Sequence, residues 1–382
     1  MPFCDAARLV KKFTLRIAQL SAMMAAALAL TAALGIASAA ASTLVRTTDG
    51  WVQGKSVGSV DQWLGVRYAA SPAGVNRWTP PKDPGFYGAR QNPYNATQFG
   101  APCPQNISQF GNSIPLPIPP NTVPVPGSAD SEDCLFLNVY VPADRSDDDG
   151  RPLPVLIWIH GGSNQFGEGS SYDPTPLVTQ GHIIVVTINY RLGALGWLAD
   201  SLLDGDTPGS SGNYGLMDQQ FAMRWVNRNI AAFGGDPRKV TIAGESAGAL
   251  DSCSHLASPT AAGLFRAAII ESGCVVFQYP QSFLEQVFGA FFVAALGCTT
   301  LACLQAQPVS AILAAALQLP WVVAVGPPIL PEAPQQAFSD GKFNKVPVIQ
   351  GTNLDEGRLF IPLFNGVLTS RDYVASLFPN TP

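Results

Sequence analysis

The sequence predicts an α/β protein built on a mixed, mostly parallel sheet with helices on its faces. Short apolar runs typical of buried parallel strands recur at residues 155–159, 183–190, 240–243, 267–270 and 346–351. Helical patterns lie between them, most clearly at 215–231 and 247–257. Strands that alternate with helices form a sheet covered by helices. With neither an internal repeat nor a linker, the pattern favours one large domain.

The composition fits a large globular domain and excludes two other classes of protein. The chain has 382 residues, 47% of them hydrophobic, which is ample for a core and excludes an intrinsically disordered chain. The net charge is −5, and because residues 1–41 carry +3, the remainder carries −8. A nucleic-acid-binding protein needs a positive surface for phosphates, so we expect no nucleic-acid partner.

Residues 1–41 have the pattern of an export signal peptide. Four basic residues precede an apolar run from Ile17 to Ile36, and the small residues at 37–41 fit a cleavage site. An uncleaved membrane anchor is the alternative, since about 20 apolar residues can span a bilayer. The pattern therefore predicts a secreted or periplasmic protein whose domain occupies residues 42–382, with no stable membrane span once the signal is cleaved.

The segments between this leader and the first buried strand are expected to be short strands and one extended loop. Residues 44–70 alternate short apolar stretches with turn residues, as small antiparallel strands do. Residues 115–126 hold six prolines, which neither donate to a sheet nor fit inside a helix, so they predict a surface excursion. The run at 135–141 predicts the next strand.

Cysteine and histidine usage argues for export and against a metal site. Six cysteines lie outside the leader, and their fifteen possible pairings leave the connectivity open. No C-x-x-C or H-E-x-x-H spacing occurs, and the histidines are limited to His160, His182 and His255. We therefore expect neither a zinc site nor any other cofactor.

A G-E-S-A-G motif at residues 244–248 is the strongest chemical signal. A G-x-S-x-G alone is weak, because glycine and serine are abundant in this chain. Here the apolar run 240–243 leads into it and a helical pattern follows, which is the context of a nucleophile elbow. The flanking glycines relieve crowding in a turn that presents the Ser246 hydroxyl. A chance glycine turn with a capping serine is the alternative.

A second motif, His-Gly-Gly-Ser at residues 160–163, directly follows the run 155–159. Acyl transfer develops negative charge on the former carbonyl oxygen, and backbone N–H groups aimed at that oxygen stabilise it. Small residues let the backbone approach closely. The motif predicts an oxyanion hole, with a flexible Gly-Gly turn as the alternative, and we interpret His160 as structural rather than as a base.

Taken together, the motifs resemble those of the type-B carboxylesterases, the family of the cholinesterases and related lipases. The resemblance extends from residue 45 to the end and implies an α/β-hydrolase fold. The matching stretches are WLGVRYAASPAGVNRWTPP (63–81), SEDCLFLNVYVP (131–142), VLIWIHGGS (155–163), NYRLGALGWL (189–198), NYGLMDQQFAMRWVNRNIAAFGGDPRKVTIAGESAG (213–248), LFRAAIIESG (264–273) and GTNLDEGRLF (351–360).

The resemblance implies the roles of five residues. Ser246 matches the nucleophile, and Glu356 matches the triad acid that orients the catalytic histidine. Gly162, Ser163 and Ala247 match the oxyanion-hole donors, although the family usually has glycine or alanine where this chain has Ser163. A carboxylate just after the run 346–351 also suits the carboxyl edge of a parallel sheet, where such sites form.

The departure that matters most concerns histidine. The family's base comes from a Gly-x-x-His segment far beyond the acid, and this chain ends 26 residues after Glu356. The three histidines present lie in the oxyanion loop, at the start of a strand and deep in a helix, so none can substitute. We therefore expect a hydrolase domain that is incomplete at its C-terminus and inactive as written. A truncated, inactive gene product is an alternative that would have the same motifs as this incomplete enzyme.

The resemblance also implies covalent and ionic links. The disulfides Cys103–Cys134 and Cys298–Cys303 match family positions. Cys253 and Cys274 either form a third disulfide or remain free, because buried thiols often stay unpaired. Two ion pairs are implied, and the alternative for each is an ordinary surface charge; they are Arg77–Glu132 and Arg191–Asp218.

The expected substrate is a small carboxylic ester. Choline-ester members place a tryptophan between the first two cysteines, and residues 103–134 contain none. This indicates general ester specificity and assigns no acyl or alcohol preference, and nothing in the sequence indicates an oligomeric state. A non-catalytic, esterase-like binding protein is the rival interpretation. It is disfavoured because this chain keeps both Ser246 and Glu356.

Overall fold

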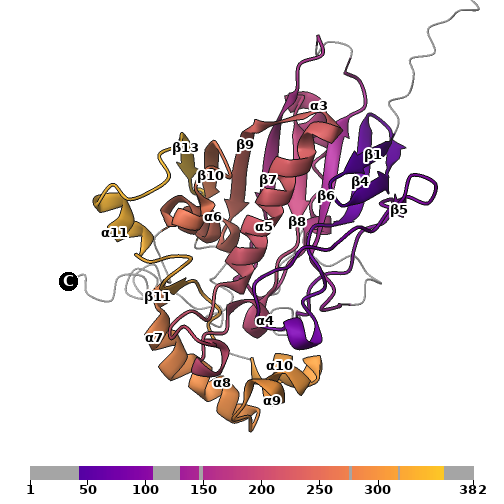
Figure 1. Cartoon of the computed structure of the whole chain (residues 1–382). Coiled ribbons are helices and arrows are strands. Elements are labelled where there is room, and N and C mark those ends of the chain that lie inside the picture. Colours follow the sequence, from indigo (N-terminus) through magenta and orange to yellow (C-terminus); the bar gives the residue numbers. More distant parts are fainter. Residues whose placement is uncertain (1–42, 106–129, 146–148, 275–277, 317–318, 357–382) are drawn as a thin grey trace, which may run out of the picture. The chain divides into compact units, whose positions relative to one another are not determined.

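Within the part of the chain that the structure describes, an eight-stranded mixed sheet forms the centre of the fold in the computed structural model (Figure 1). The structure describes residues 43–105, 130–145, 149–274, 278–316 and 319–356. The expected signal peptide, the proline-rich segment 115–126 and the chain after Glu356 lie outside these ranges.

Strand order and direction follow the expected mixed pattern. From one edge to the other, the strands are β13 (Val348–Gly351), β10 (Ala267–Glu271), β9 (Gly235–Glu245), β7 (Leu153–Ile159), β8 (Ile184–Ile188), β6 (Phe136–Pro142), β4 (Val60–Arg67) and β3 (Lys55–Val57). The first five are mutually parallel, and β6, β4 and β3 continue the sheet in antiparallel pairings. The carboxyl ends of β7, β9, β10 and β13 therefore meet at one edge.

Helices cover the two faces of this sheet because the strand side chains alternate between two apolar clusters. Ile157 and Val186 join the main core, whereas Leu156 and Val185 join a smaller one. Helices α5 (Tyr214–Asn229) and α6 (Ala247–Ala257) pack on the first side against β9, and α3 (Thr175–Gly181) packs on the second against β6 (Figure 1). The predicted helices 215–231 and 247–257 correspond to α5 and α6.

Shorter elements surround the sheet. The strands β1 (Leu44–Thr47), β2 (Gly50–Gln53) and β5 (Tyr94–Asn95) form one small sheet, and β11 (Tyr279–Pro280) and β12 (Ala324–Val325) form another. The remaining helices are α4 (Gly193–Trp197), α7 (Gln281–Leu284), α8 (Ala290–Ala295), α9 (Leu301–Ala306), α10 (Val309–Ala315) and α11 (Pro334–Ser339), with a π-helical turn over Glu285–Gly289 between α7 and α8.

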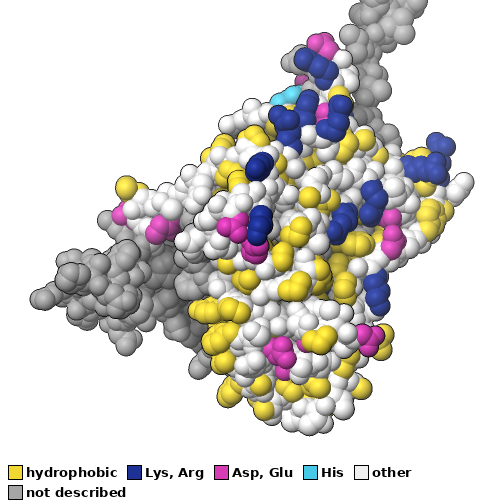
Figure 2. Space-filling model, turned by 60° about the vertical axis from the view of Figure 1, so that its left-hand side comes forward, with side chains coloured by type: hydrophobic (Ala, Val, Ile, Leu, Met, Phe, Trp, Pro, Cys, Tyr) yellow, Lys and Arg dark blue, Asp and Glu magenta, His cyan; other side chains and the backbone are white. Residues whose placement is uncertain are grey.

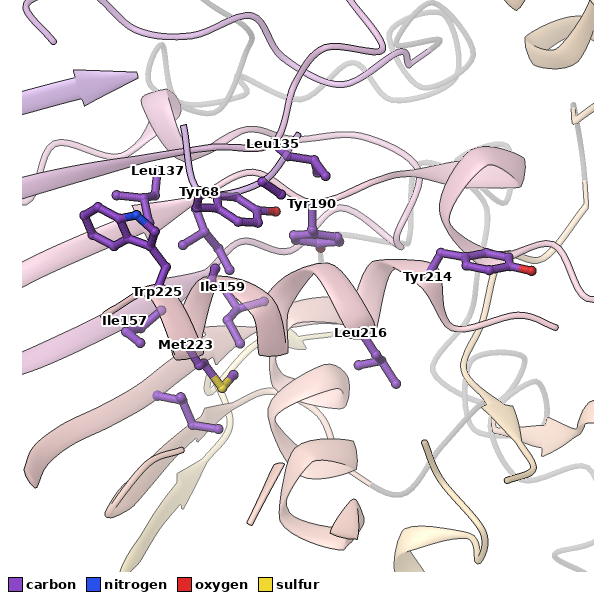
Figure 3. Packing of buried hydrophobic residues seen from close by; sticks show 14 of the residues in the cluster. Tyr68, Leu135, Leu137, Ile157, Ile159, Tyr190, Tyr214, Leu216, Met223 and Trp225 are labelled. Carbon is purple, nitrogen blue, oxygen red and sulfur yellow. The ribbon is translucent and has the colours of Figure 1, made fainter. Parts of the chain in front are cut away.

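The main core lies between the sheet and helix α5. Figure 3 shows Trp225 and Met223 of this helix facing Ile157 of β7 and Leu137 of β6. The Trp225 indole N–H donates to a carboxylate oxygen of Asp49 at 2.9 Å, so the buried ring leaves no polar atom unsatisfied. This packing rigidly supports the strands whose ends carry the site.

Strand β13 departs from its expected environment. The run 346–351 was predicted to be a buried parallel strand, and it does pair in parallel with β10. All four residues of β13 are nevertheless exposed, and Ile349 is 68% exposed. The prediction of burial is wrong because, in the part of the chain that the structure describes, β13 is the edge of the sheet with one neighbour.

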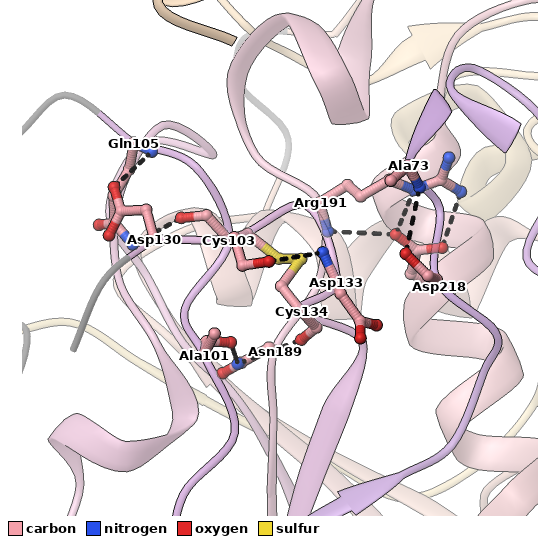
Figure 4. The surroundings of a disulfide bond; sticks show 12 residues. Ala73, Ala101, Cys103, Gln105, Asp130, Asp133, Cys134, Asn189, Arg191 and Asp218 are labelled. Atoms are coloured by element: carbon pink, nitrogen blue, oxygen red, sulfur yellow. Dashed lines mark hydrogen bonds and ion pairs between the residues drawn. A yellow bond between two sulfur atoms is a disulfide. The ribbon is translucent and has the colours of Figure 1, made fainter. Parts of the chain in front are cut away.

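Both expected disulfides and both expected ion pairs are confirmed, and Figure 4 shows the disulfide Cys103–Cys134 and the ion pair Arg191–Asp218. Cys253 and Cys274 form a third disulfide, which links α6 to the segment after β10. The ion pairs are buried rather than superficial, and residues of both line one small cavity together with Cys134. They therefore belong to the packed interior.

One surface of the molecule carries exposed apolar side chains. Hydrophobic groups gather in the lower part of the view in Figure 2. Phe283, Val287 and Phe291, spaced one helical turn apart along α7, the π-turn and α8, are among the exposed large hydrophobic residues. Within the described ranges, no helix has the length and apolar character that a membrane crossing requires.

Candidate active site

Ser246 lies in a sharp turn between the end of β9 and the start of α6. Its backbone has φ 53° and ψ −118°, a conformation that a non-glycine residue rarely adopts. The Ser246 N–H donates to the carbonyl of Glu271 at 3.0 Å, which ties the turn to the neighbouring strand β10. This is the strand-turn-helix geometry of a nucleophile elbow.

Close backbone approach explains the two glycines of the motif. A Cβ on Gly248 would lie 2.0 Å from the carbonyl oxygen of Ile159, and one on Gly244 would lie 2.4 Å from Gly248. A larger residue at 248 would push α6 away from β7, and a larger residue at 244 would push α6 away from β9. The two glycines of the motif are therefore required by the packing of α6, as well as by the chemistry that the turn serves.

The 160–163 loop lies against Ser246. A Cβ on Gly161 would lie 3.2 Å from Cβ of Ser246 and 2.8 Å from the Glu245 carbonyl oxygen. Among the described residues, no hydrogen bond uses the N–H of Gly162 or Ser163. Ala247 occupies the first position of α6, where an N–H has no partner within its helix. These groups remain available to an acceptor.

Three consecutive residues of this loop have positive φ. The values are 106° at Gly162, 56° at Ser163 and 58° at Asn164. The left-handed region costs a non-glycine residue roughly 1–2 kcal/mol, so Ser163 and Asn164 require support from their surroundings. Part of it comes from Tyr190, whose hydroxyl donates to the His160 carbonyl at 2.7 Å.

Glu356 lies at the same edge of the sheet as Ser246. Its Oε1 accepts hydrogen bonds from the Ser272 hydroxyl and, at 2.7 Å, from the Asn353 N–H. Ser272 directly follows Glu271, whose carbonyl binds the N–H of Ser246. Burial raises the pKa of Glu245, and the negative charges of Glu356 and Glu271 raise it further.

Two of the three histidines are buried in other roles. The His160 ring stacks on Tyr190 with centroids 4.4 Å apart, and its Nδ1 lies 2.8 Å from the Gly161 carbonyl oxygen. Nε2 of His255 lies 2.7 Å from Oε1 of Gln219. Burial lowers the pKa of His160 to about 4 and that of His255 to about 3. Both are therefore neutral core side chains.

His182 lies at the opposite edge of the sheet. It follows α3 and precedes β8, whose first residue, Ile184, pairs with Val155 near the start of β7. Ser246 lies at the opposite end of these strands, just after the position where Ile159 of β7 pairs with Gly244 of β9. Among the described residues, no hydrogen bond joins the Ser246 hydroxyl to His160 or His255 either.

Asp251 is a buried carboxyl group that the sequence analysis did not single out. It lies on α6, five residues after Ser246, and is fully buried. Its Oδ2 accepts a hydrogen bond of 2.6 Å from Nε2 of Gln219. Burial raises its pKa to about 7, against the opposing effects of Gln219 and Asn164.

This carboxyl group makes stability depend on pH in a defined direction. The pKa of Asp251 in the folded protein lies above the unfolded value of 3.8, so folding favours the protonated acid. The stability that this protonation contributes is fully present below pH 3.8 and is lost as the pH rises to about 7. Asn resembles the protonated acid, so Asp251→Asn should gain stability over the parent across this range, by at most about 4 kcal/mol. Urea unfolding of both proteins between pH 4 and 8 measures this difference. A difference that does not change with pH would contradict the assignment.

Comparison with known proteins agrees with this geometry. A model of the Carboxylesterase family matches residues 41–376. The chain belongs to the carboxylesterase family. It is 38% identical over 333 residues to the para-nitrobenzyl esterase of Bacillus subtilis, an alignment that covers 83% of this chain and 63% of that protein. The chain thus spans less than two thirds of that relative's length.

Other relatives of this carboxylesterase-family chain have different names. It is 34% identical to the acylcarnitine hydrolase of mouse, over 85% of this chain and 58% of that protein. It is also 35% identical to mouse neuroligin-3, over 84% of this chain and 42% of that protein. The solved structure of a carboxylesterase from Geobacillus stearothermophilus superposes with a TM-score of 0.75 at 33% identity, covering 89% of this chain and 68% of that one. The expected α/β-hydrolase fold is confirmed.

One cavity in the described part of this carboxylesterase-family domain is remote from Ser246. This cavity of about 460 Å³ is lined by residues of the α6 C-terminus, of α11 and of the segment after α11, including Leu256, Ala337 and Phe343. Ser246 precedes the other end of α6, and 11 helical residues span about 16 Å. Among the described residues, no cluster of three or more His, Cys, Asp or Glu side chains could hold a metal ion.

The structure also reveals residues at the site that the motifs did not indicate. The Tyr190 hydroxyl contacts the His160 carbonyl and the Asn164 side chain, and the Ser272 hydroxyl donates to Glu356. Asn164 directly follows a glycine-rich turn, and Asp251 lies inside a helix of small residues. These two polar residues in unusual positions could have been singled out from the sequence. Ser272 carried no such signal, because its role depends on the pairing of β10 with β13.

Proposed function

We propose that this protein is a serine carboxylic ester hydrolase that acts through an acyl-enzyme. One observation carries the proposal: the Ser246 elbow faces the backbone of the 160–163 loop at the sheet edge that also holds Glu356. The carboxylesterase family supports the reaction class. In this proposal the nucleophile is Ser246, the triad acid is Glu356, and the oxyanion donors are the N–H groups of Gly162, Ser163 and Ala247.

The reaction follows from these positions. The Ser246 hydroxyl attacks the ester carbonyl carbon while its proton passes to a base, and the resulting oxyanion accepts hydrogen bonds from the loop and the helix terminus. Collapse of the tetrahedral intermediate expels the alcohol, which takes up the proton. Water then attacks the acyl-enzyme in the same way and releases the acid. Glu356 would orient an imidazole base and stabilise its cation.

Supplying the base in solution tests this proposal. In millimolar imidazole, we expect the chain to hydrolyse 4-nitrophenyl acetate faster than Ser246→Ala does in the same buffer. The variant corrects for hydrolysis by imidazole itself. A 4-nitrophenolate burst, with an acetylated Ser246 found by mass spectrometry, would identify the acyl-enzyme. Equal rates for the two proteins would refute the proposal.

Glu356 and Asp355 give a matched pair of variants for the triad acid. Because Glu356 is placed to orient the base, we predict that Glu356→Gln lowers imidazole-dependent turnover by at least about tenfold, toward the 10⁴-fold loss known for a triad acid. Asp355→Asn removes an adjacent exposed carboxylate and should stay within about twofold of the parent. A larger loss with Asp355→Asn would reverse the assignment.

A second candidate function is that of a non-catalytic, esterase-like binding protein. The 35% identity to neuroligin-3, a relative whose name denotes no hydrolase, favours it. The imidazole experiment discriminates the two, because a binding protein needs no reactive Ser246.

We also propose that the protein is exported. Three disulfides support this location, because disulfides persist in oxidising compartments and are rare in the cytosol. N-terminal sequencing of protein recovered outside the cytoplasm should begin near residue 42. Recovery of an intact N-terminus from a membrane fraction would instead identify an anchor.

A further inference from the structure

Glu356 lies in a segment that has little packing of its own. Residues 351–355 are exposed, and Leu354 is 97% exposed. The Glu356 carboxylate is instead held by hydrogen bonds from the Ser272 hydroxyl and the Asn353 N–H. The Asn353 side chain also donates to the Ser272 hydroxyl, at 3.3 Å. The position of the acid therefore depends on the position of Ser272, which belongs to the end of another strand.

The turn that carries Ser272 directly follows β10; it comprises residues 272–274, and we call it the acid-holding turn. Ser272 has φ 61°, in the left-handed region, so its backbone needs support from neighbouring contacts. A Cβ on Gly273 would lie 3.1 Å from the Ser246 carbonyl oxygen, so the turn closely approaches the elbow. On its other side, the Ser272 N–H donates to the Gly351 carbonyl at 2.8 Å. The acid-holding turn thus lies between the nucleophile and β13.

Two links fasten the acid-holding turn on the side of the nucleophile. Before the turn, the Glu271 carbonyl accepts the N–H of Ser246 at 3.0 Å. At its end, a disulfide joins Cys274 to Cys253, a fully buried residue of α6 that lies almost two helical turns from Ser246. The first link is a single hydrogen bond, whereas the second is covalent and anchored in the core. Ser272 lies between the two links.

We propose that the Cys253–Cys274 disulfide is a positioning link, which holds the acid-holding turn against the nucleophile helix and thereby orients Glu356 toward the base. The inference rests on the proposed esterase function, because it assigns the link to the triad acid. In this role neither cysteine reacts with the ester, and the link acts through the Ser272 hydroxyl. Without it, the turn loses its covalent anchor and the carboxylate loses its fixed orientation.

Removing the link in the imidazole assay tests this role. In the linkless protein, Cys253→Ala with Cys274→Ala, we expect kcat to fall about tenfold with KM within twofold, because orienting the base affects the transition state rather than ester binding. Cys253→Val with Cys274→Ala fills more of the buried space, and it serves as the linkless protein if the first variant does not fold. Cys298→Ala with Cys303→Ala removes the disulfide between α8 and α9 and should stay within twofold of the parent.

A double-mutant cycle with Glu356→Gln separates positioning from general destabilisation. If the link acts through the acid, the two losses overlap, so Glu356→Gln should cost at most about threefold in the linkless protein. In the parent the same change should cost at least about tenfold. A full tenfold loss in the linkless protein, or an unchanged kcat when the link is removed, would overturn the proposal.

Hydrogen exchange tests the link independently of turnover. Exchange of the Ser272 amide, resolved by overlapping peptides that end at residues 271 and 274, should accelerate at least tenfold in the linkless protein. The Cys298→Ala, Cys303→Ala control should leave it unchanged. Unchanged exchange in the linkless protein would overturn the link as an anchor of the turn. If the parent lacked Ser246-dependent turnover, the proposed function would fail on its own, and exchange would still decide whether the disulfide holds the acid-holding turn.

Discussion

Without added imidazole, purified residues 42–382 should hydrolyse a short-chain aryl ester at a rate set by the oxyanion hole and substrate binding alone. Enzymes that lose their triad retain an acceleration of about 10³–10⁴ over water, roughly 10⁶ below the intact enzyme. A serine hydroxyl needs an adjacent base near neutral pH, and the structure places His160 and His255 in the core and His182 at the opposite sheet edge.

The measurement is an assay of the chain beside Ser246→Ala, each without imidazole. The two rates should differ little. Ser246-dependent turnover at ordinary enzymatic rates would show that another group in the chain serves as base. The variants His160→Gln and His255→Gln would then identify it, and loss of turnover in one of them would overturn our assignment of that histidine to the core.

Asp218→Asn should lower the free energy of unfolding by about 3–5 kcal/mol, because it leaves a buried guanidinium without its counter-charge. Nε and Nη2 of Arg191 donate to the two oxygens of Asp218 at 2.7 and 2.8 Å, and the Asp218 side chain is 0% exposed. The Arg191 N–H also donates to Asp218 at 3.1 Å, and Nη1 donates to the Thr79 carbonyl at 2.9 Å. The pair therefore joins α5, the segment after β8 and the N-terminal segment.

Urea unfolding of three variants checks this prediction. The double change Arg191→Met with Asp218→Leu should recover much of the loss, because well-packed apolar residues replace a buried ion pair at little cost. Arg151→Ala removes the exposed pair with Asp149 and should cost at most about 1 kcal/mol. A loss below 1 kcal/mol for Asp218→Asn would mean that water reaches the guanidinium.

The local patterns of this chain were sufficient to predict its parallel strands and its elbow. Each of the five predicted runs forms a strand, and the helix predicted at 247–257 is α6. A strand buried on both faces must be apolar along its length, and a strand-turn-helix of this tightness needs glycine at 244 and 248. Both requirements act between residues that are close in the sequence, so a local sequence pattern is enough to predict them.

Family resemblance extended the prediction to links between distant residues. It implied two disulfides and two ion pairs, which the structure confirms, but not that the ion pairs are buried or that Cys253 bonds Cys274. Burial depends on what packs around a pair, which no single segment specifies.

What the sequence determined by itself is therefore the set of elements and the chemistry of the residues at their ends. Tertiary structure alone decided the rest: that Ser272 holds Glu356 and that β13 is exposed. Ser272 and Glu356 are 84 residues apart in the sequence, and they meet only because the parallel strands β10 and β13 bring their carboxyl ends to one edge. The left-handed turn at 162–164 has the same origin, since contacts from Tyr190 and Gly193 hold a conformation that its own residues would not adopt alone.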